Sequence, residues 1–308
     1  MDYNDTDSIN PGGKPNEINL IRRMSHESPL TLVLLTVCAG MGALVVGEAL
    51  LSTWVTASSA ALIGSLLRLT IGAVFISFLI RRGLGSRAGV TCLTAANKPF
   101  WLIGFSPLCF FLFANLSGLN PSSWQLTTTI LLAWFVENIS VGFFEEVLFR
   151  GWALYILLQA WGATRRGLVT ACIVQALLFG PLHLLNALGD EPIMLVLSNT
   201  VFATIVGIAF GAAYAYSRSL WTCVTIHTLI NMAASANGVL GPNEPLAEKA
   251  FSLSTFLPSL VVVIVLSLLP SIWILYKVDL RSSHNDQETD ELGKPAPSVS
   301  ATPSTPKP

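Results

Sequence analysis

The chain has polar ends and a long interior made of apolar runs. Eight apolar stretches between residues 30 and 276 are each about long enough to cross a bilayer, which takes roughly 20 residues. They are rich in Leu, Ile and Val and lack turn residues, which predicts helices rather than strands. We expect spans at 30–55, 61–80, 100–118, 125–158, 167–187, 192–216, 220–240 and 255–276. The pattern predicts an all-α fold, a polytopic membrane helical bundle of about eight transmembrane helices.

Composition narrows the class of protein. Only 11% of residues are charged and 52% are hydrophobic, whereas soluble domains are about 25% charged. This excludes a soluble enzyme and a disordered protein, and five cysteines without a CxxC pair exclude a disulfide scaffold. A net charge of −1 gives no reason to propose nucleic-acid binding. We divide the chain into a polar segment (1–28), a membrane-embedded domain (29–276) and a Pro/Ser/Thr-rich tail (277–308) that we expect to be disordered.

Lysines and arginines predict the orientation. Fourteen of the 17 lie in the N-terminal segment, the C-terminal tail and three loops, at 81–99, 159–166 and 217–219. Cytoplasmic loops carry such an excess of basic residues, so both termini are expected in the cytoplasm, which agrees with an even number of spans. We expect a multi-pass cell-membrane protein, and the tail composition and the lack of organelle signals favour a bacterial plasma membrane.

Ionisable side chains inside predicted spans are candidates for function, because each costs at least a few kcal/mol in a bilayer. Glu48 and Arg68 lie at matching depths in the first two spans, which predicts a structural ion pair. Glu146 and Arg150 are four residues apart with the acid first, the favourable order on one helical face. Glu145 is rotated by about 100°, which suits a general base with a raised pKa. Alternatively, both acids merely neutralise Arg150.

Two histidines lie in apolar spans, each beside a partner four residues away. Phe179 and His183 share one face, and Pro181 between them should kink the helix. His227 and Asn231 share a face of a later span. A lone membrane histidine is often only an interhelical contact, but the coincidence of two such pairs favours a function.

The span at 192–216 carries a small residue at every fourth position, at Ala203, Gly207, Gly211 and Ala215. Such a stripe is typical of closely packed membrane helices, and we assign it no chemistry. No internal repeat is visible, so an inverted-repeat transporter is not supported.

Three motifs occur in order: EExxxR (Glu145, Glu146, Arg150), FxxxH (Phe179, His183) and HxxxN (His227, Asn231). Together they closely resemble the motif set of the CPBP intramembrane proteases, also called the Abi or CAAX-protease-like family. The resemblance covers roughly residues 125–240, which we take as the motif core of a CPBP-like protease domain. It implies that Glu146 and Arg150 organise the site.

The resemblance also implies a division of catalytic roles. Glu145 with His183 would activate a water molecule, while His227 and Asn231 would face the oxyanion. No cofactor is firmly predicted. Zn²⁺ bound by Glu145, His183 and His227 remains an alternative, but the chain has no HExxH motif, and Asn231 suits hydrogen bonding to an oxyanion better than metal binding.

The predicted function is therefore an intramembrane endopeptidase that hydrolyses a peptide bond in a membrane-associated or lipidated peptide or protein. Its expected partners are the lipid bilayer and this substrate. A non-catalytic immunity or sensor-partner protein on the same scaffold is the alternative. A transporter is less favoured, because the ionisable groups cluster around one site instead of following a pathway.

Overall fold

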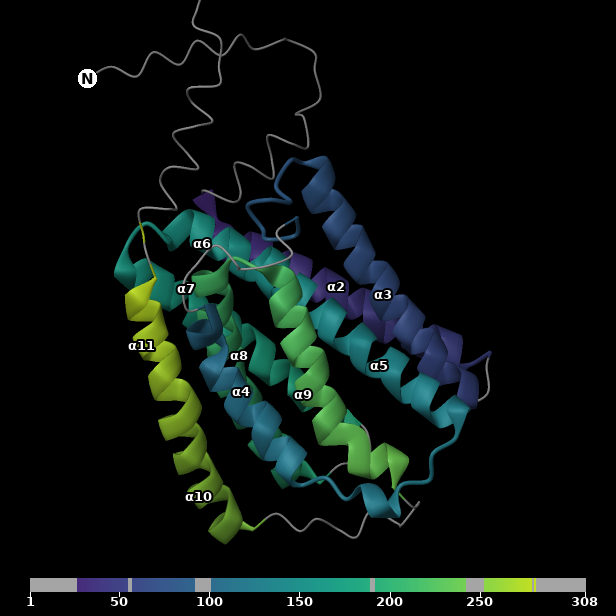
Figure 1. The fold of residues 1–308 in the computed structure, drawn as a ribbon. Coiled ribbons are helices and arrows are strands. Elements are labelled where there is room, and N and C mark those ends of the chain that lie inside the picture. The colour runs from purple at the N-terminus through teal and green to yellow at the C-terminus, as the bar shows by residue number, and fades with distance from the viewer. Residues whose placement is uncertain are drawn as a thin grey trace, which may run out of the picture.

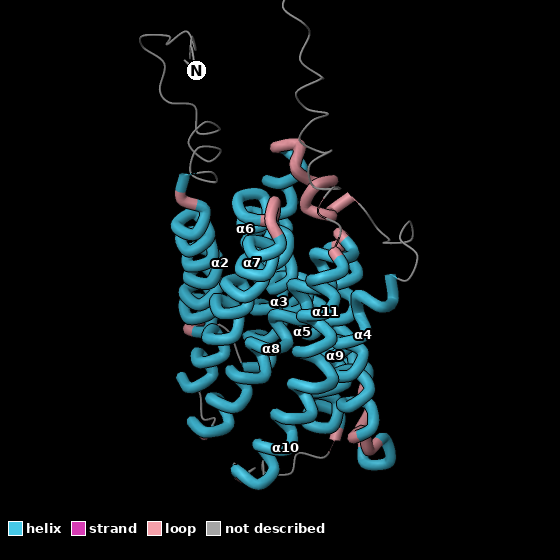
Figure 2. Tube along the Cα trace, turned by 90° about the vertical axis from the view of Figure 1, so that its left-hand side faces the viewer, coloured by secondary structure: helices cyan, strands magenta, loops and turns pink. Residues whose placement is uncertain are grey.

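A computed structural model describes residues 27–54, 57–91, 101–188, 192–241, 252–278 and 280. Almost all of the N-terminal segment and of the C-terminal tail lies outside the described residues. The cytoplasmic location expected for both termini therefore stays a prediction. The elements that position the site are α2 (Pro29–Ser52), α3 (Ala57–Arg81), α4 (Trp101–Ser117), α5 (Thr128–Glu146), α6 (Tyr155–Trp161), α7 (Arg165–Phe179), α8 (Ile193–Ser217), α9 (Leu220–Leu240), α10 (Leu253–Val263) and α11 (Leu269–Lys277). The described residues contain helices and no strand (Figure 2).

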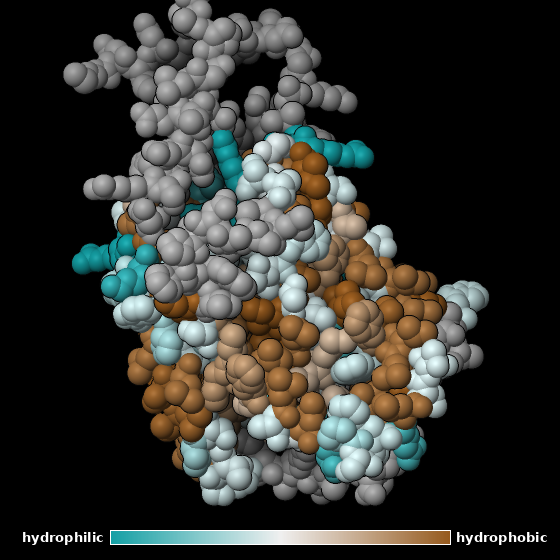
Figure 3. Space-filling model, in the orientation of Figure 1, coloured by the Kyte–Doolittle hydropathy of each residue, from teal (hydrophilic) through white to brown (hydrophobic). Residues whose placement is uncertain are grey.

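Among the residues that the structure describes, six helices are long and apolar enough to cross a membrane, which supports the prediction of an all-helical membrane protein. They are Pro29–Leu51, Ala60–Arg81, Arg165–Ala187, Ile193–Ser217, Leu220–Leu240 and Leu253–Lys277. Hydrophobic side chains cover much of the middle of the molecule between more polar ends (Figure 3). The other two expected spans correspond to α4, which is shorter, and to the stretch that begins with α5, which carries three glutamates.

Three expected spans are not uniform α-helices. The span expected at 125–158 consists of α5, the π-helix η2 (Val147–Leu154) and α6. The span at 167–187 is α7 followed by the 3₁₀-helix η3 (Gly180–Leu188), and the last span contains the π-helix η4 (Ile264–Leu268). Where we expected a kink at Pro181, the regular α-helix ends at Phe179 and a 3₁₀-helix follows, since proline cannot donate the hydrogen bond that an α-helix needs there. The π-helices were not expected, and such segments are frequent at functional sites.

Side-chain caps begin the helices that carry the motifs. The hydroxyl of Thr127 accepts a hydrogen bond from the Ile130 amide at the start of α5. Thr164 caps α7 and Ser219 caps α9 in the same way. Each cap satisfies one of the free amides at a helix start, so the sequence fixes where these helices begin.

The helices pack so that α5 lies between α3 and α9, while α8 packs against α7 and α4 (Figure 1). The small-residue stripe of α8 packs closely, as expected, and its partner is α7: a Cβ added to Gly207 would lie 3.1 Å from the Ala176 Cβ. Gly180 permits an even closer approach, since an added Cβ would lie 2.9 Å from the Thr204 Cα. This packing brings η3, with its histidine, against α8.

Candidate active site

The three motifs meet where α5, η2, α7 and α9 approach one another, and Phe179 of α7 contacts both Arg150 and His227. Glu145 and Glu146 are the last residues of α5, and Arg150 lies in η2, where every residue is buried. His183 lies in η3 and His227 in α9. Residues 81 positions apart in the sequence are thereby in direct contact, since His227 reaches Glu146.

Glu146 and Arg150 form a fully buried ion pair. Arg150 Nη1 donates to Glu146 Oε1 at 2.7 Å, and both side chains are 0% exposed. The guanidinium also lies over the rings of Phe179 and Phe210, with its central carbon 4.7 and 4.8 Å from their centroids. Cation–π contacts of this kind strengthen when they are desolvated. The predicted pair is confirmed, and two aromatic rings hold its cation in place.

Glu146 uses the same carboxylate oxygen to bind His227. His227 Nδ1 lies 2.7 Å from Glu146 Oε1, and a carboxylate in an ion pair can only accept a hydrogen bond. Nδ1 therefore carries the hydrogen. This leaves Nε2 directed at the other acid, with Glu145 Oε2 at 3.6 Å.

Glu145 differs from its neighbour in exposure and in partners. Its side chain is 25% exposed, against 0% for Glu146. Only Glu146 lies within ion-pair distance of Arg150, so the alternative in which both acids neutralise the arginine is wrong. The 3.6 Å between Glu145 and His227 Nε2 is too long for a hydrogen bond, but a water molecule can bind both groups at once. Glu145 is thus the accessible acid of the pair.

His183 lies beside the ion pair on its aromatic side. Its ring packs edge-on against Phe179 at 5.3 Å, and His227 packs against the same ring at 6.3 Å. His183 Nδ1 is buried and has no hydrogen-bond partner among the described residues. Neither of its ring nitrogens lies within 4.0 Å of Glu145, whose ion-pair contact is with His227. Because buried polar atoms in proteins nearly always form a hydrogen bond, we expect a water molecule or a ligand to bind this nitrogen.

Asn231 lies one turn beyond His227 on α9 and is half-buried. Its backbone carbonyl accepts a hydrogen bond from the Ser235 hydroxyl. Its side-chain amide forms no hydrogen bond with any described residue and therefore retains both of its N–H donors for a ligand.

The candidate zinc ligands do not form a metal cluster. Among the described residues, no three His, Cys, Asp or Glu side chains lie close enough together to hold an ion.

Phe210 and Gly142 are two residues of the site that the sequence analysis missed. Phe210 is fully buried and contacts both the Arg150 guanidinium and the His227 ring, whose centroid is 5.0 Å away. It lies in the span to which we assigned only a packing stripe. A Cβ added to Gly142 would lie 2.6 Å from Thr228 Oγ1, so this glycine lets α5 and α9 approach beside the acids. Neither residue belongs to a spaced polar motif that would have revealed it.

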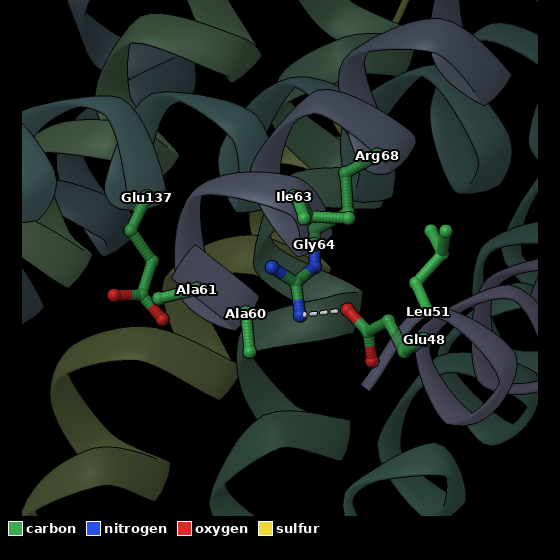
Figure 4. A pocket seen from close by; sticks show the side chains of 8 residues that line it. All are labelled: Glu48, Leu51, Ala60, Ala61, Ile63, Gly64, Arg68 and Glu137. Atoms are coloured by element: carbon green, nitrogen blue, oxygen red, sulfur yellow. Dashed lines mark ion pairs between the residues drawn. The ribbon is translucent and has the colours of Figure 1, made fainter. Parts of the chain in front are cut away.

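The remaining intramembrane charges lie apart from this site. Arg68 Nη2 is 2.7 Å from Glu48 Oε1, which confirms the ion pair expected between α2 and α3 (Figure 4). Glu137 lies on α5, more than two turns before Glu145 and Glu146, and is exposed.

Comparison with known families identifies the segment that contains the site. Residues 127–233 match the Rce1-like family, described as type II CAAX prenyl endopeptidase Rce1-like. This stretch contains all six candidate residues and confirms the resemblance read from the motifs. Neither a curated protein nor a solved structure matches the chain. The fold is that of a multi-pass membrane protein, and its matched segment is similar to the type II CAAX prenyl endopeptidase family.

Proposed function

We propose that this protein is an intramembrane endopeptidase that cleaves a membrane-associated or lipidated peptide or protein. The observation that carries the proposal is the contrast between the two adjacent acids. Glu146 is sealed against Arg150 and His227, whereas Glu145 is partly exposed with His227 Nε2 opposite it. Glu146 is thus bound by Arg150 and His227, whereas Glu145 is accessible to a water molecule or substrate. Both lie within a segment that matches a family of endopeptidases.

In the proposed reaction, Glu145 binds a water molecule and takes its proton as the hydroxyl attacks the scissile carbonyl carbon. His183 assists by hydrogen bonding to the same water, which would satisfy its buried Nδ1 or position its other nitrogen. The proton held by Glu145 then passes to the leaving amine, so that the carboxylate is regenerated when the peptide bond breaks.

The negative charge that develops on the carbonyl oxygen is met by His227 and Asn231. With Nδ1 bonded to Glu146, His227 donates from Nε2 when its ring carries both hydrogens. The Asn231 amide supplies a second donor from the next turn of α9. Donors of this kind act mainly in the transition state, where the oxyanion exists. This mechanism uses no metal ion, and no step requires one.

The proposed topology has eight spans with both termini in the cytoplasm, in the plasma membrane of a bacterium. The stretches that begin with α4 and α5 are then the two additional spans. The basic loops support this orientation. The consecutive helices α5, η2 and α6 would form one span, with the Glu146–Arg150 ion pair inside the bundle.

The proposal is tested by comparing the peptide termini in membranes from cells that produce the wild-type protein, Glu145→Gln or Thr225→Ala. Thr225 is exposed on α9 and, among the described residues, its hydroxyl bonds only to the Trp221 carbonyl, which makes it a matched control outside the site. We expect new termini with the wild type and Thr225→Ala and none with Glu145→Gln at equal protein levels. Identical termini in all three would refute proteolysis.

The same cells distinguish the non-catalytic alternative. An immunity or sensor-partner protein would act through binding, so Glu145→Gln would retain full activity in a protection or signalling assay. Loss of both the phenotype and the new termini in Glu145→Gln supports the enzyme.

A further inference from the structure

A second polar site lies at the end of the bundle where α2 ends and α3 begins. A cavity of about 240 Å³ opens there between α2, α3 and α5. Its charged lining residues are Glu48, Arg68 and Glu137, one from each helix, and the other lining residues are glycine, alanine and larger aliphatic side chains (Figure 4). This cavity includes none of the six candidate catalytic residues.

The Glu48–Arg68 ion pair in the cavity does not include the third charged residue, Glu137. Arg68 binds Glu48 at 2.7 Å, and Gly64 gives this pair its room, because an added Cβ would lie 2.9 Å from Glu48 Oε1. Figure 4 shows the Arg68 guanidinium between the carboxylates of Glu48 and Glu137. No described cation lies within ion-pair distance of Glu137, so the cavity has a formal charge of −1 and a carboxylate without a counter-charge.

The cavity extends from near the level of the lipid headgroups into the membrane span. Ala60 and Ala61, which line it, are in the first turn or so of α3. At 1.5 Å per residue, the 25 residues of α3 extend about 38 Å, beyond the roughly 30 Å hydrocarbon core. The start of α3 therefore reaches the polar region. Glu48 remains 36% exposed and Arg68 20%, so a molecule in the surrounding lipid has access to both.

The charges select among headgroups. Glu137 suits a primary ammonium, which can donate hydrogen bonds to a carboxylate, while the outer face of the Arg68 guanidinium suits a phosphate. A quaternary ammonium cannot donate, and the described residues of this lining include none of the aromatic rings that recognise choline. Phosphatidylserine and phosphatidylglycerol carry a net negative charge, which the cavity repels. We propose that this cavity binds the headgroup of phosphatidylethanolamine.

The test measures lipid binding to the purified full-length protein in detergent by native mass spectrometry. Short-chain phosphatidylethanolamine, phosphatidylcholine and phosphatidylglycerol with identical acyl chains are titrated in turn. We expect at least a tenfold preference of the wild type for phosphatidylethanolamine over either competitor. Equal binding of the three, or preference for phosphatidylglycerol, overturns the proposal.

Two variants locate the binding. Glu137→Gln removes the unpaired carboxylate, and Ala61→Leu fills the cavity without changing charge; each should reduce the preference at least tenfold. Val74→Leu, a similar enlargement at an exposed position of the same helix, is the control and should retain it. Unchanged preference in Ala61→Leu overturns the proposal even if Glu137→Gln does not fold. Because the site is separate from Glu145, Glu145→Gln protein should bind the lipid like the wild type whether or not the chain is a protease.

Discussion

Replacing Arg150 by methionine tests whether the buried ion pair supports the fold or serves only the chemistry. The change keeps an apolar stem but removes the cation from a site where it and Glu146 are both 0% exposed. Glu146 would then face low dielectric with His227 as its remaining partner. Breaking a buried pair by removing one partner costs about 3–5 kcal/mol, and the loss of contacts with Phe179 and Phe210 acts in the same direction. The expected fall in unfolding temperature is on the order of 10 °C.

The assay is thermal unfolding of the purified protein in one detergent, followed by tryptophan fluorescence. Two further variants separate the contribution of the ion pair from that of either acid alone. Glu145→Gln should unfold like the wild type, because this acid is 25% exposed and lies 3.6 Å from its nearest ion-pair partner. The double variant Glu146→Gln/Arg150→Met should be more stable than Arg150→Met alone, because it no longer strands a charge. If the double variant loses as much as the sum of its single changes, or if Glu145→Gln is equally unstable, the roles assigned to the two acids are wrong.

Three further outcomes are expected. Reporter fusions after residues 90 and 285 should be cytoplasmic and one at 246 external, whereas an external C-terminus would rule out the eight-span topology. Asn231→Ala should lower kcat by a factor of about 10²–10³, the range for one oxyanion donor, with little change in KM. A rise in KM by a similar factor with kcat unchanged would indicate a substrate-binding role instead. Purified wild type should contain far less than one zinc per chain and remain active after EDTA or phenanthroline, and stoichiometric zinc that disappears together with activity in His227→Ala would replace the proposed mechanism with a metal-dependent one.

Local sequence signals predicted much of this molecule. Hydropathy located the helices to within a few residues, because each span is a continuous apolar run. The i,i+4 spacing of Glu146 and Arg150 predicted their pair, and matched depth predicted the pair of Glu48 with Arg68. Pro181 predicted the end of regular α-helix near residue 180, since its effect on the backbone is local.

Features that depend on how distant helices pack were not predictable in this way. Phe210 contacts Arg150 and His227 only because α8 packs against η2 and α9. No local signal in the sequence predicted the π-helix at Val147–Leu154, every residue of which is buried. The contact of His227 with both acids likewise required the register between α5 and α9, which Gly142 and Thr228 set by close approach.

The shared oxygen of Glu146 bears on how such a protein can change over generations. Arg150 and His227 both bind Glu146 Oε1 at 2.7 Å, so a loss at any of these three positions leaves a buried charge or donor without its partner. Glu145 is under no such constraint. A lineage that abandoned proteolysis for a binding role would therefore be expected to lose Glu145 first and to keep the other three residues long afterwards. Under the proposed mechanism, Glu146, Arg150 and His227 would then be conserved with the scaffold, whereas the residue at position 145 would show whether proteolysis is conserved as well.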